Sequence, residues 1–192
     1  MPHTLTTARL LLRGWRESDR EPFRAMNADP RVMEFFPATL TADETDQMMV
    51  RNERHFERHG FGLYAAELTE TGAFIGFIGL NIPTFDAAFM PAVEIGWRLR
   101  PACWGRGLAS EGARALVDHA FGALNLKSLV SFTTVANLRS RRVMERIGMV
   151  HDAAADFDHP NLREGHPLRR HVLYRRNAQA DGISMGPLNL SE

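Results

Sequence analysis

The sequence predicts a single α/β (α+β) domain, in which one mixed, mostly antiparallel sheet is flanked by about four helices. Length is the first observation, because 192 residues suit one hydrophobic core better than two. The second is that short apolar runs separated by polar turns fill the middle of the chain. The third is that strand patterns and helix patterns alternate after residue 92.

The first expected elements are a short strand and two helices. Residues 9–13 (RLLLR) form an apolar run with charged ends, and either Ser18 or Asp19 can cap a helix after it. Residues 41–59 open with a threonine and two acids and contain few strand-forming residues, which predicts a second helix. Gly60 is expected to end that helix.

A meander is expected next, and strands and helices then alternate. The strand-like runs of the meander cover residues 61–68, 73–81 and 92–100. Apolar residues then recur at helical spacing from Ala109 to Ala120. The remaining elements are expected to be a strand at 128–135, a helix at 137–147 that ends at Gly148, and a final strand that contains 172–174.

The domain is expected to span residues 1–177. Residues 178–192 show no hydrophobic period and contain glycine, proline and serine, which predicts a flexible C-terminal tail. Exposed strand edges would allow a homodimer, although composition does not decide between a monomer and a dimer.

Composition excludes several classes of protein. The 23 Lys and Arg residues balance the 23 Asp and Glu residues, so no net charge draws the chain to nucleic acid or to an anionic membrane. The longest apolar stretch, residues 73–83, is interrupted and shorter than the roughly 18 residues that suggest a membrane span. The start of the chain does not resemble a signal peptide, so we expect a soluble, cytoplasmic protein with no nucleic-acid or membrane partner.

Neither cysteine nor histidine indicates a metal or redox centre. Cys103 is the single cysteine, which excludes an intrachain disulfide and a CxxC site, and we interpret it as a packing or surface thiol rather than a nucleophile. His55 and His59 have the i, i+4 spacing of metal ligands, but no third ligand is apparent. No metal is therefore expected.

A glycine-rich turn between a strand and a helix is the strongest local signal. Gly105 and Gly107 follow the strand at 92–100 and precede the helix that starts near Ala109. Backbone N–H groups of such a turn, with the unpaired N–H groups of the helix, form an anion site, although the glycines alone fit a tight turn without a ligand equally well. Arg98, Arg100 and Arg106 would suit a polyanionic cofactor, but each can also be a solvated surface charge.

Two polar residues mark the start of the helix at 137–147. Asn137 can be an ordinary N-cap, which is the favoured interpretation, or it can contact a ligand. Ser140 lies on the apolar face of this helix, where its hydroxyl would either bond back to a helix carbonyl or face a ligand.

Glu94 is the third candidate. Strand alternation puts Glu94, Gly96 and Arg98 on one face, and the missing side chain at Gly96 leaves room for a substrate. A cross-strand ion pair is the alternative role for this carboxylate.

Two segments, EIGWRLRPACWGRGLASEGARALVDHAF and NLRSRRVMERIGM, resemble the CoA-binding segments of the GNAT superfamily of N-acetyltransferases. The resemblance is greatest to the branch of ribosomal-protein N-terminal acetyltransferases. It extends from about Thr7 to Arg176 and includes RLLLR and an ending, GHPLRRHVLYRR, that resembles the final hairpin of that branch. It implies the GNAT fold, with a sheet of about six or seven strands, and acetyl-CoA as co-substrate.

The resemblance also implies roles for particular residues. Those whose backbone amides would hold the pyrophosphate are Trp104, Gly105, Arg106, Gly107, Leu108 and Ala109. The pantetheine arm would lie along the backbone of Trp97 and Leu99 and against Asn137, and Arg142 is a further cofactor contact. The thioester would lie where this strand and the next one part.

The sequence departs from the family pattern at two positions. Ala102 stands where glutamine or arginine is usual, and Met144 stands where most members have a tyrosine that protonates the thiolate. In the ribosomal-protein branch a serine at the position of Ser140 is thought to act as this acid.

The implied reaction is direct transfer of an acetyl group to a primary amine of a protein or peptide N-terminus, or of a small molecule. Glu94 is the candidate base, directly or through water, and Ser140 would protonate or hydrogen-bond the sulfur. Backbone N–H groups of the strand would stabilise the oxyanion. Candidates for the acceptor wall are Trp15, Phe35, Phe36 and His171, with core packing as the alternative for the aromatic residues and a structural role as the alternative for the histidine.

Two other functions fit parts of the pattern. A non-catalytic acyl-CoA sensor would account for the missing tyrosine and for Ala102. An acyltransferase that uses a longer acyl chain would account for Phe35, Phe36 and the many methionines.

Overall fold

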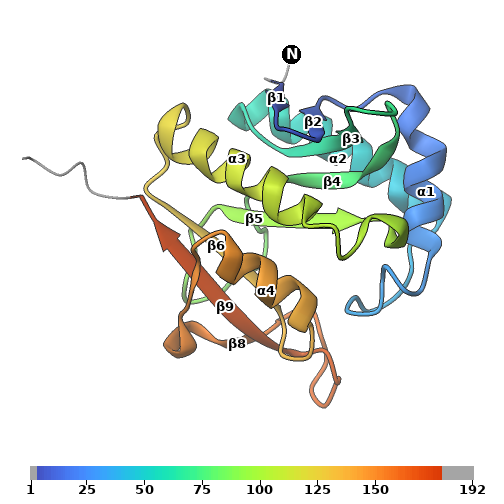
Figure 1. The fold of residues 1–192 in the computed structure, drawn as a ribbon. Helices are drawn as coiled ribbons and strands as arrows, with labels where there is room; N and C mark the ends of the chain where they lie inside the picture. The colour runs from blue at the N-terminus through green and yellow to red at the C-terminus, as the bar shows by residue number, and fades with distance from the viewer. Residues whose placement is uncertain (1–3, 179–192) are drawn as a thin grey trace, which may run out of the picture.

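The structure is a computed structural model, and it describes residues 4–178. The expected tail therefore lies outside the described residues, except for Ala178. Within this range the chain forms one 9-stranded sheet with helices on both faces, in the order expected from the sequence (Figure 1). The strands are β1 (Leu5–Thr6), β2 (Leu10–Arg13), β3 (Leu63–Leu68), β4 (Phe74–Asn81), β5 (Glu94–Leu99), β6 (Ser128–Thr134), β7 (Val150–His151), β8 (Phe157–Asp158) and β9 (Arg170–Asn177).

The sheet has more strands than the six or seven expected. The additional ones are the two-residue strands β1, β7 and β8, which pair with β2 or β9. A two-residue strand is too short to show a period of two in the sequence, so only its pairing reveals it.

The α-helices agree with the expected positions. They are α1 (Arg20–Ala28), α2 (Ala42–His59), α3 (Leu108–Gly122) and α4 (Leu138–Arg146), and three short 3-10 helices accompany them at Glu17–Asp19, Pro101–Cys103 and Ala153–Ala155. The ends of α2 follow from its sequence: Thr41 and Glu44 form a capping box, and Gly60 ends the helix with φ of 75°.

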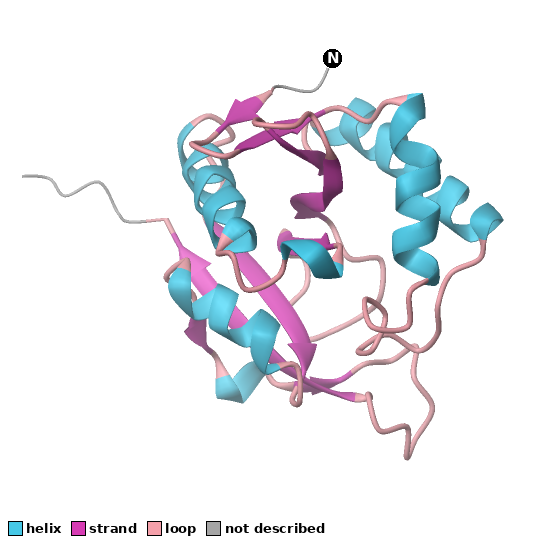
Figure 2. Cartoon of the chain, turned by 45° about the vertical axis from the view of Figure 1, so that its right-hand side comes forward, coloured by secondary structure: helices cyan, strands magenta, loops and turns pink. Residues whose placement is uncertain are grey.

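Two apolar clusters lie on opposite faces of the sheet. Helices α3 and α4 cover one face, where Leu116 and Met144 join the larger cluster (Figure 1). Helices α1 and α2 cover the other, where Phe23 and Met49 pack with Phe77 of β4. Figure 2 shows α1 and α2 on the opposite side of the molecule from α3 and α4.

The sheet is divided between β5 and β6. Strands β1 to β5 pair antiparallel, and β6 pairs antiparallel with β9. Strands β5 and β6 are parallel and meet at a single register pair, Glu94 with Val130. The Val130 N–H donates to Val93 O at 2.9 Å, and no further pairing joins these strands in the described chain. The two halves of the sheet therefore part directly after Glu94.

Candidate active site

A cavity of about 770 Å³ lies at the point where β5 and β6 part. It is lined by residues from the α1–α2 loop, both faces of β5, the glycine loop, β6, α4 and the segment that leads into β9. Glu94, Gly96 and Arg98 belong to one face of β5, and Trp97 and Leu99 belong to the other. The cavity is therefore lined from both faces of β5, as a site for two bound molecules requires.

Glu94 lines the cavity without an ion-pair partner in the described chain. Its cross-strand neighbour is Asn81, so the alternative of a cross-strand ion pair is wrong. Burial raises the pKa of Glu94 to about 7, and a hydrogen bond with the Asn81 side chain partly opposes this rise. A carboxyl group with this pKa can accept a proton near neutral pH.

Open space next to Glu94 comes from Gly96. A Cβ atom built on Gly96 would meet only Glu94 Oε1, at 3.8 Å. Gly79 of β4 pairs with Gly96, and a Cβ atom built on Gly79 would lie 2.3 Å from Leu63 Cα. Thus the first glycine leaves room for a ligand, whereas the second allows close packing of the backbone.

The glycine loop has the geometry of an anion site. Gly105 and Gly107 have φ of 72° and 77°, which L side chains rarely adopt. In the described chain no backbone acceptor pairs with the N–H groups of Gly105, Arg106 or Gly107, and the first turn of α3 adds unpaired N–H groups from Leu108 and Ala109. The loop can therefore direct several N–H donors at one anion.

Other parts of the chain hold this loop in position. Arg9 Nη1 donates to Arg106 O at 3.0 Å, and Arg9 also pairs with Glu111 of α3 at 2.6 Å. Trp104 Nε1 donates to Leu99 O at 2.7 Å. The Trp104 N–H donates to Pro101 O at 3.1 Å, so this amide is occupied within the protein, unlike the others expected to hold pyrophosphate.

The two polar residues at the start of α4 differ in whether their side chains already make hydrogen bonds within the protein. Asn137 is the N-cap: its Oδ1 accepts from the Ser140 N–H at 3.2 Å, and its Nδ2 donates to Thr133 Oγ1 at 2.9 Å. The Ser140 Oγ makes no hydrogen bond within residues 4–178, so back-bonding to a helix carbonyl does not occur. Both residues line the cavity, and Ser140 has a hydroxyl available to a ligand.

Met144 does not line the cavity. This side chain is fully buried in the core. The position usual for tyrosine in the family is therefore occupied by a packing residue here.

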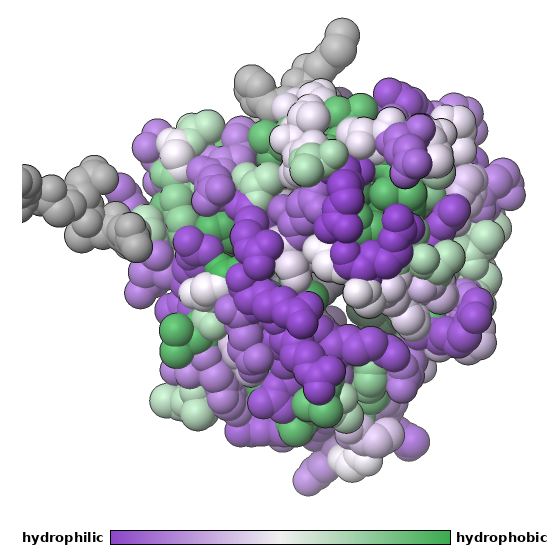
Figure 3. All heavy atoms as spheres, in the orientation of Figure 1, coloured by the Kyte–Doolittle hydropathy of each residue, from purple (hydrophilic) through white to green (hydrophobic). Residues whose placement is uncertain are grey.

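Cations from α4 border the cavity beside the glycine loop. Arg142 is exposed and lines the cavity without an ion pair in the described chain. Arg139 lies over the Trp104 ring at 4.6 Å and pairs with Glu34 of the α1–α2 loop at 2.5 Å. Figure 3 shows a hydrophilic surface over α4 and a hollow next to it.

The three arginines that would suit a polyanionic cofactor lie in different places. Arg98 Nη1 donates to Asn27 of α1 at 2.7 Å, on the face of the sheet opposite α3, and Arg100 Nη1 donates to Phe74 O at 3.2 Å. Arg98 therefore lies on the face of Glu94, as strand alternation predicts, and not beside the glycine loop, while Arg100 is exposed, as in the alternative of a surface charge. Arg106 is exposed in the loop itself, although its side chain does not line the cavity.

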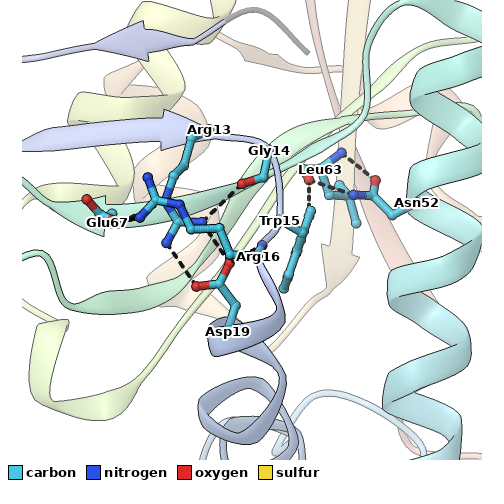
Figure 4. A network of polar contacts seen from close by, with 8 residues as sticks. All are labelled: Arg13, Gly14, Trp15, Arg16, Asp19, Asn52, Leu63 and Glu67. Carbon is cyan, nitrogen blue, oxygen red and sulfur yellow. Dashed lines mark hydrogen bonds and ion pairs between the residues drawn. The ribbon is translucent and has the colours of Figure 1, made fainter. Parts of the chain in front are cut away.

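The expected acceptor residues are partly brought together. Phe35, Phe36 and His171 line the cavity. Trp15 does not: its Nε1 donates to Leu63 O at 2.6 Å (Figure 4), and its ring packs against Phe23 at 4.7 Å between centroids. Trp15 is thus partly buried against the apolar cluster under α1 and α2.

Sequence reasoning missed several cavity residues, and two of them have notable polar side chains. Ser110, in the first turn of α3, has a buried Oγ without a partner, and the glycine loop before it could have indicated this residue. His159 lies 5.1 Å from His171 between ring centroids, and burial lowers the pKa of both imidazoles. It comes from an irregular segment with no sequence signal.

The remaining sequence expectations concern cysteine, metal and membrane. Cys103 is buried in the core and touches the cavity. His55 and His59 lie 4.5 Å apart between ring centroids, and within the described range no group of three His, Cys, Asp or Glu residues could hold a metal ion. Each helix in residues 4–178 is too short or too polar to cross a membrane.

Comparison with known proteins identifies the family. The family model for the acetyltransferase (GNAT) domain matches residues 9–150. The FsC-acetyl coenzyme A-N(2)-transacetylase of Aspergillus fumigatus is 34% identical over 173 residues, which cover 84% of this chain and 73% of that protein. The Bacillus subtilis protein YkkB is 31% identical over 146 residues, covering 76% of this chain and 84% of that protein.

Solved structures agree with this match. An acetyltransferase from Agrobacterium tumefaciens is similar with a TM-score of 0.73 and 33% identity, over 91% of this chain and 94% of that one. RimL, a ribosomal L7/L12 α-N-protein acetyltransferase in complex with coenzyme A, shares the fold with a TM-score of 0.74 and 19% identity, over 93% of this chain and 100% of that one. This chain therefore belongs to the GNAT acetyltransferases, a family of acyl-transferring enzymes.

Proposed function

We propose that this enzyme is an acetyl-CoA-dependent N-acetyltransferase that transfers the acetyl group directly to a primary amine. The observation that carries the proposal is Glu94: a carboxyl group with a pKa of about 7 lies next to open space where β5 and β6 part. Such a group can take a proton from an amine at neutral pH, because no ion pair within the described residues engages its carboxylate.

The side of the cavity next to α3 and α4 suits coenzyme A. A pyrophosphate needs several donors, and the loop amides of Gly105, Arg106 and Gly107 are free to supply them. The buried Ser110 Oγ, which lacks a partner, adds a hydroxyl donor, and Arg142 adds a cation. The printed name of the A. fumigatus relative, an acetyl-CoA transacetylase, supports the same donor.

The reaction then uses two groups on either side of the gap. An ammonium acceptor loses one proton to the Glu94 carboxylate, which passes it to solvent, and its nitrogen forms the C–N bond at the thioester carbonyl. The nitrogen then loses its second proton to solvent. The C–S bond breaks, and Ser140 donates a hydrogen bond or a proton to the departing sulfur and regains its proton from solvent. Overall, the ammonium and acetyl-CoA give the amide, CoA and one proton. N–H groups on the β5 edge that faces the gap are the donors for the oxyanion.

Free-CoA release tests the proposal. Purified protein would be given acetyl-CoA with N-terminal peptides, polyamines, amino acids or aminoglycosides, while calorimetry follows acetyl-CoA binding. Turnover with one amine class supports the enzyme and identifies the acceptor. Binding of acetyl-CoA without turnover on any amine would favour the sensor function, and preference for a longer acyl-CoA would replace acetyl as the transferred group.

A further inference from the structure

Arg98 is a partly buried cation with a buried Nε and no counter-charge within the described residues. Its Nε is buried and has no hydrogen-bond partner within residues 4–178, and no carboxylate of that range forms an ion pair with its guanidinium. Burial lowers the pKa of Arg98 to about 10. Removing an unpaired charge from water is unfavourable, so an arginine held in this way is expected to meet a negative charge that an apolar side chain could not bind.

Three elements hold the guanidinium in one orientation. Asn27 of α1 accepts a hydrogen bond from Arg98 Nη1 at 2.7 Å and donates one to Thr45 Oγ1 of α2 at 3.3 Å. Asn27 and Thr45 are both fully buried. The Phe36 ring covers the guanidinium at 4.2 Å. All of these partners are neutral, so they fix the position of the cation without balancing its charge.

Arg98 faces the same cavity as the proposed base. Glu94 and Arg98 share one face of β5, and only the open space at Gly96 lies between them. The other lining residues on this side of the sheet are mostly apolar, namely Val32, Phe35, Phe36, Met48, Leu63 and Phe77. This side of the cavity therefore combines a base for an amine, a cation and an apolar wall.

We propose that Arg98 binds a carboxylate of the acceptor, so that the acceptor is a small primary amine that also carries a carboxylate. This inference rests on the proposed function and specifies its substrate class. A planar guanidinium with a free edge matches a carboxylate in shape, and one cation among neutral groups balances one negative charge. The amine would lie near Glu94 and the carboxylate near Arg98, along β5.

The test is a pair of matched acceptor series. The acids are glycine, β-alanine, 4-aminobutyrate, 5-aminovalerate and 6-aminohexanoate, with apolar α-amino acids such as L-methionine, and each is compared with the amine or amide that lacks the carboxylate. The readout is the ratio of kcat/KM for each acid to that for its neutral counterpart, because a structural role of Arg98 would change both values together. The length that gives the largest ratio reports the spacing between amine and carboxylate.

Arg98→Met removes the charge and Arg98→Lys keeps it without the planar fork. We expect the acid-to-amine ratio to fall about 10- to 100-fold in Arg98→Met and to recover partly in Arg98→Lys. Arg100→Met is the matched control, because Arg100 directly follows β5, is exposed and does not line the cavity. Its ratio should equal that of the wild type.

Two outcomes would overturn the inference. If neutral amines are acetylated as well as the acids, or if Arg98→Met keeps the wild-type ratio, Arg98 does not bind the acceptor, while the proposed function stands. If nothing is acetylated, the proposed function fails, and calorimetric titration of the same acids into the CoA-saturated protein still decides the inference. Binding of acids by the wild type and not by Arg98→Met supports it, and equal binding by both contradicts it.

Discussion

The Val130 N–H donates to the Val93 carbonyl at 2.9 Å, immediately before the point where β5 and β6 part. Glu94 follows Val93 and is the first residue of β5, so it lies at the closed end of the gap. Past this pair, the backbone groups of β5 that face β6 have no strand partner in the described chain. One local break in a ladder thus provides both a place for a thioester and donors for its oxyanion.

Glu94→Gln should abolish most turnover and leave acetyl-CoA binding intact, because the amide cannot accept a proton. We expect kcat/KM to fall about 100-fold or more. In the wild type, kcat/KM should rise with pH through the pKa of about 7 as Glu94 ionises. Glutamine removes this dependence and leaves only that of the amine. A wild-type profile that stays flat between pH 6 and 8, and matches the variant, would exclude Glu94 as the base.

The same substitution should stabilise the fold at neutral and alkaline pH. The folded-state pKa of Glu94 is raised from 4.5 to about 7, so its contribution to stability is complete below pH 4.5 and is lost as pH rises through 7. Glutamine carries no such loss. Urea unfolding at pH 8 should give Glu94→Gln a free energy of unfolding higher by on the order of 1 to 3 kcal/mol, with no difference at pH 4. A variant that is less stable at pH 8 would show that the carboxylate is paired in the native protein.

Ser140→Ala should lower kcat without weakening the helix that carries it. The cap of α4 uses the backbone N–H of Ser140, which alanine retains, whereas Asn137→Ala removes the cap itself. We expect Ser140→Ala to lose about 10-fold or more in kcat at wild-type melting temperature. Asn137→Ala should lose about 1 kcal/mol of stability. If Ser140→Ala keeps the kcat of the wild type, the Ser140 hydroxyl takes no part in the reaction.

Alanine at Gly105 or Gly107 should weaken CoA binding. Both glycines have positive φ, and alanine there costs about 1 kcal/mol or shifts the loop so that its N–H groups no longer converge. We expect the Kd for CoA to rise about 10-fold. Gly60→Ala is the control, since Gly60 has φ of 75° and open space around it but lies at the end of α2, outside the cavity lining. It should lose similar stability and bind CoA normally.

Gly96→Ala should keep the fold and impair the acceptor. The added methyl group meets only Glu94 Oε1 at 3.8 Å, so the melting temperature should not change. The KM for the amine should rise, because the methyl group enters the space beside the base. Gly79→Ala, where the methyl group would clash with the backbone of β3, should instead unfold at lower temperature. An unchanged KM in Gly96→Ala would mean that the acceptor binds elsewhere.

The sequence was sufficient to predict the order of the elements and the local backbone at several positions of the cavity. The helix that starts after Thr41, the turn at Gly105 and Gly107 and the shared face of Glu94 and Gly96 all depend on neighbours within a few residues. Their prediction needed only local propensity and the period of a strand or helix.

Features that depend on distant contacts were not predictable. The two-residue strands β7 and β8 exist only through pairing with β9. Strand alternation places Arg98 on the face of Glu94, but its contact with Asn27, 71 residues away, leaves no trace in the local pattern. Trp15 was assigned to the acceptor wall, although tertiary packing turns its ring into the core.

The most direct test of the account is the acetyl-CoA-dependent change in mass of an amine acceptor, measured beside free-CoA release for the wild type and for Glu94→Gln. The account predicts that the acceptor gains one acetyl group for each CoA released, and that Glu94→Gln binds acetyl-CoA with wild-type affinity but gives little product. An acceptor that gains no acetyl group while the protein binds acetyl-CoA, or equal product from Glu94→Gln, would contradict it.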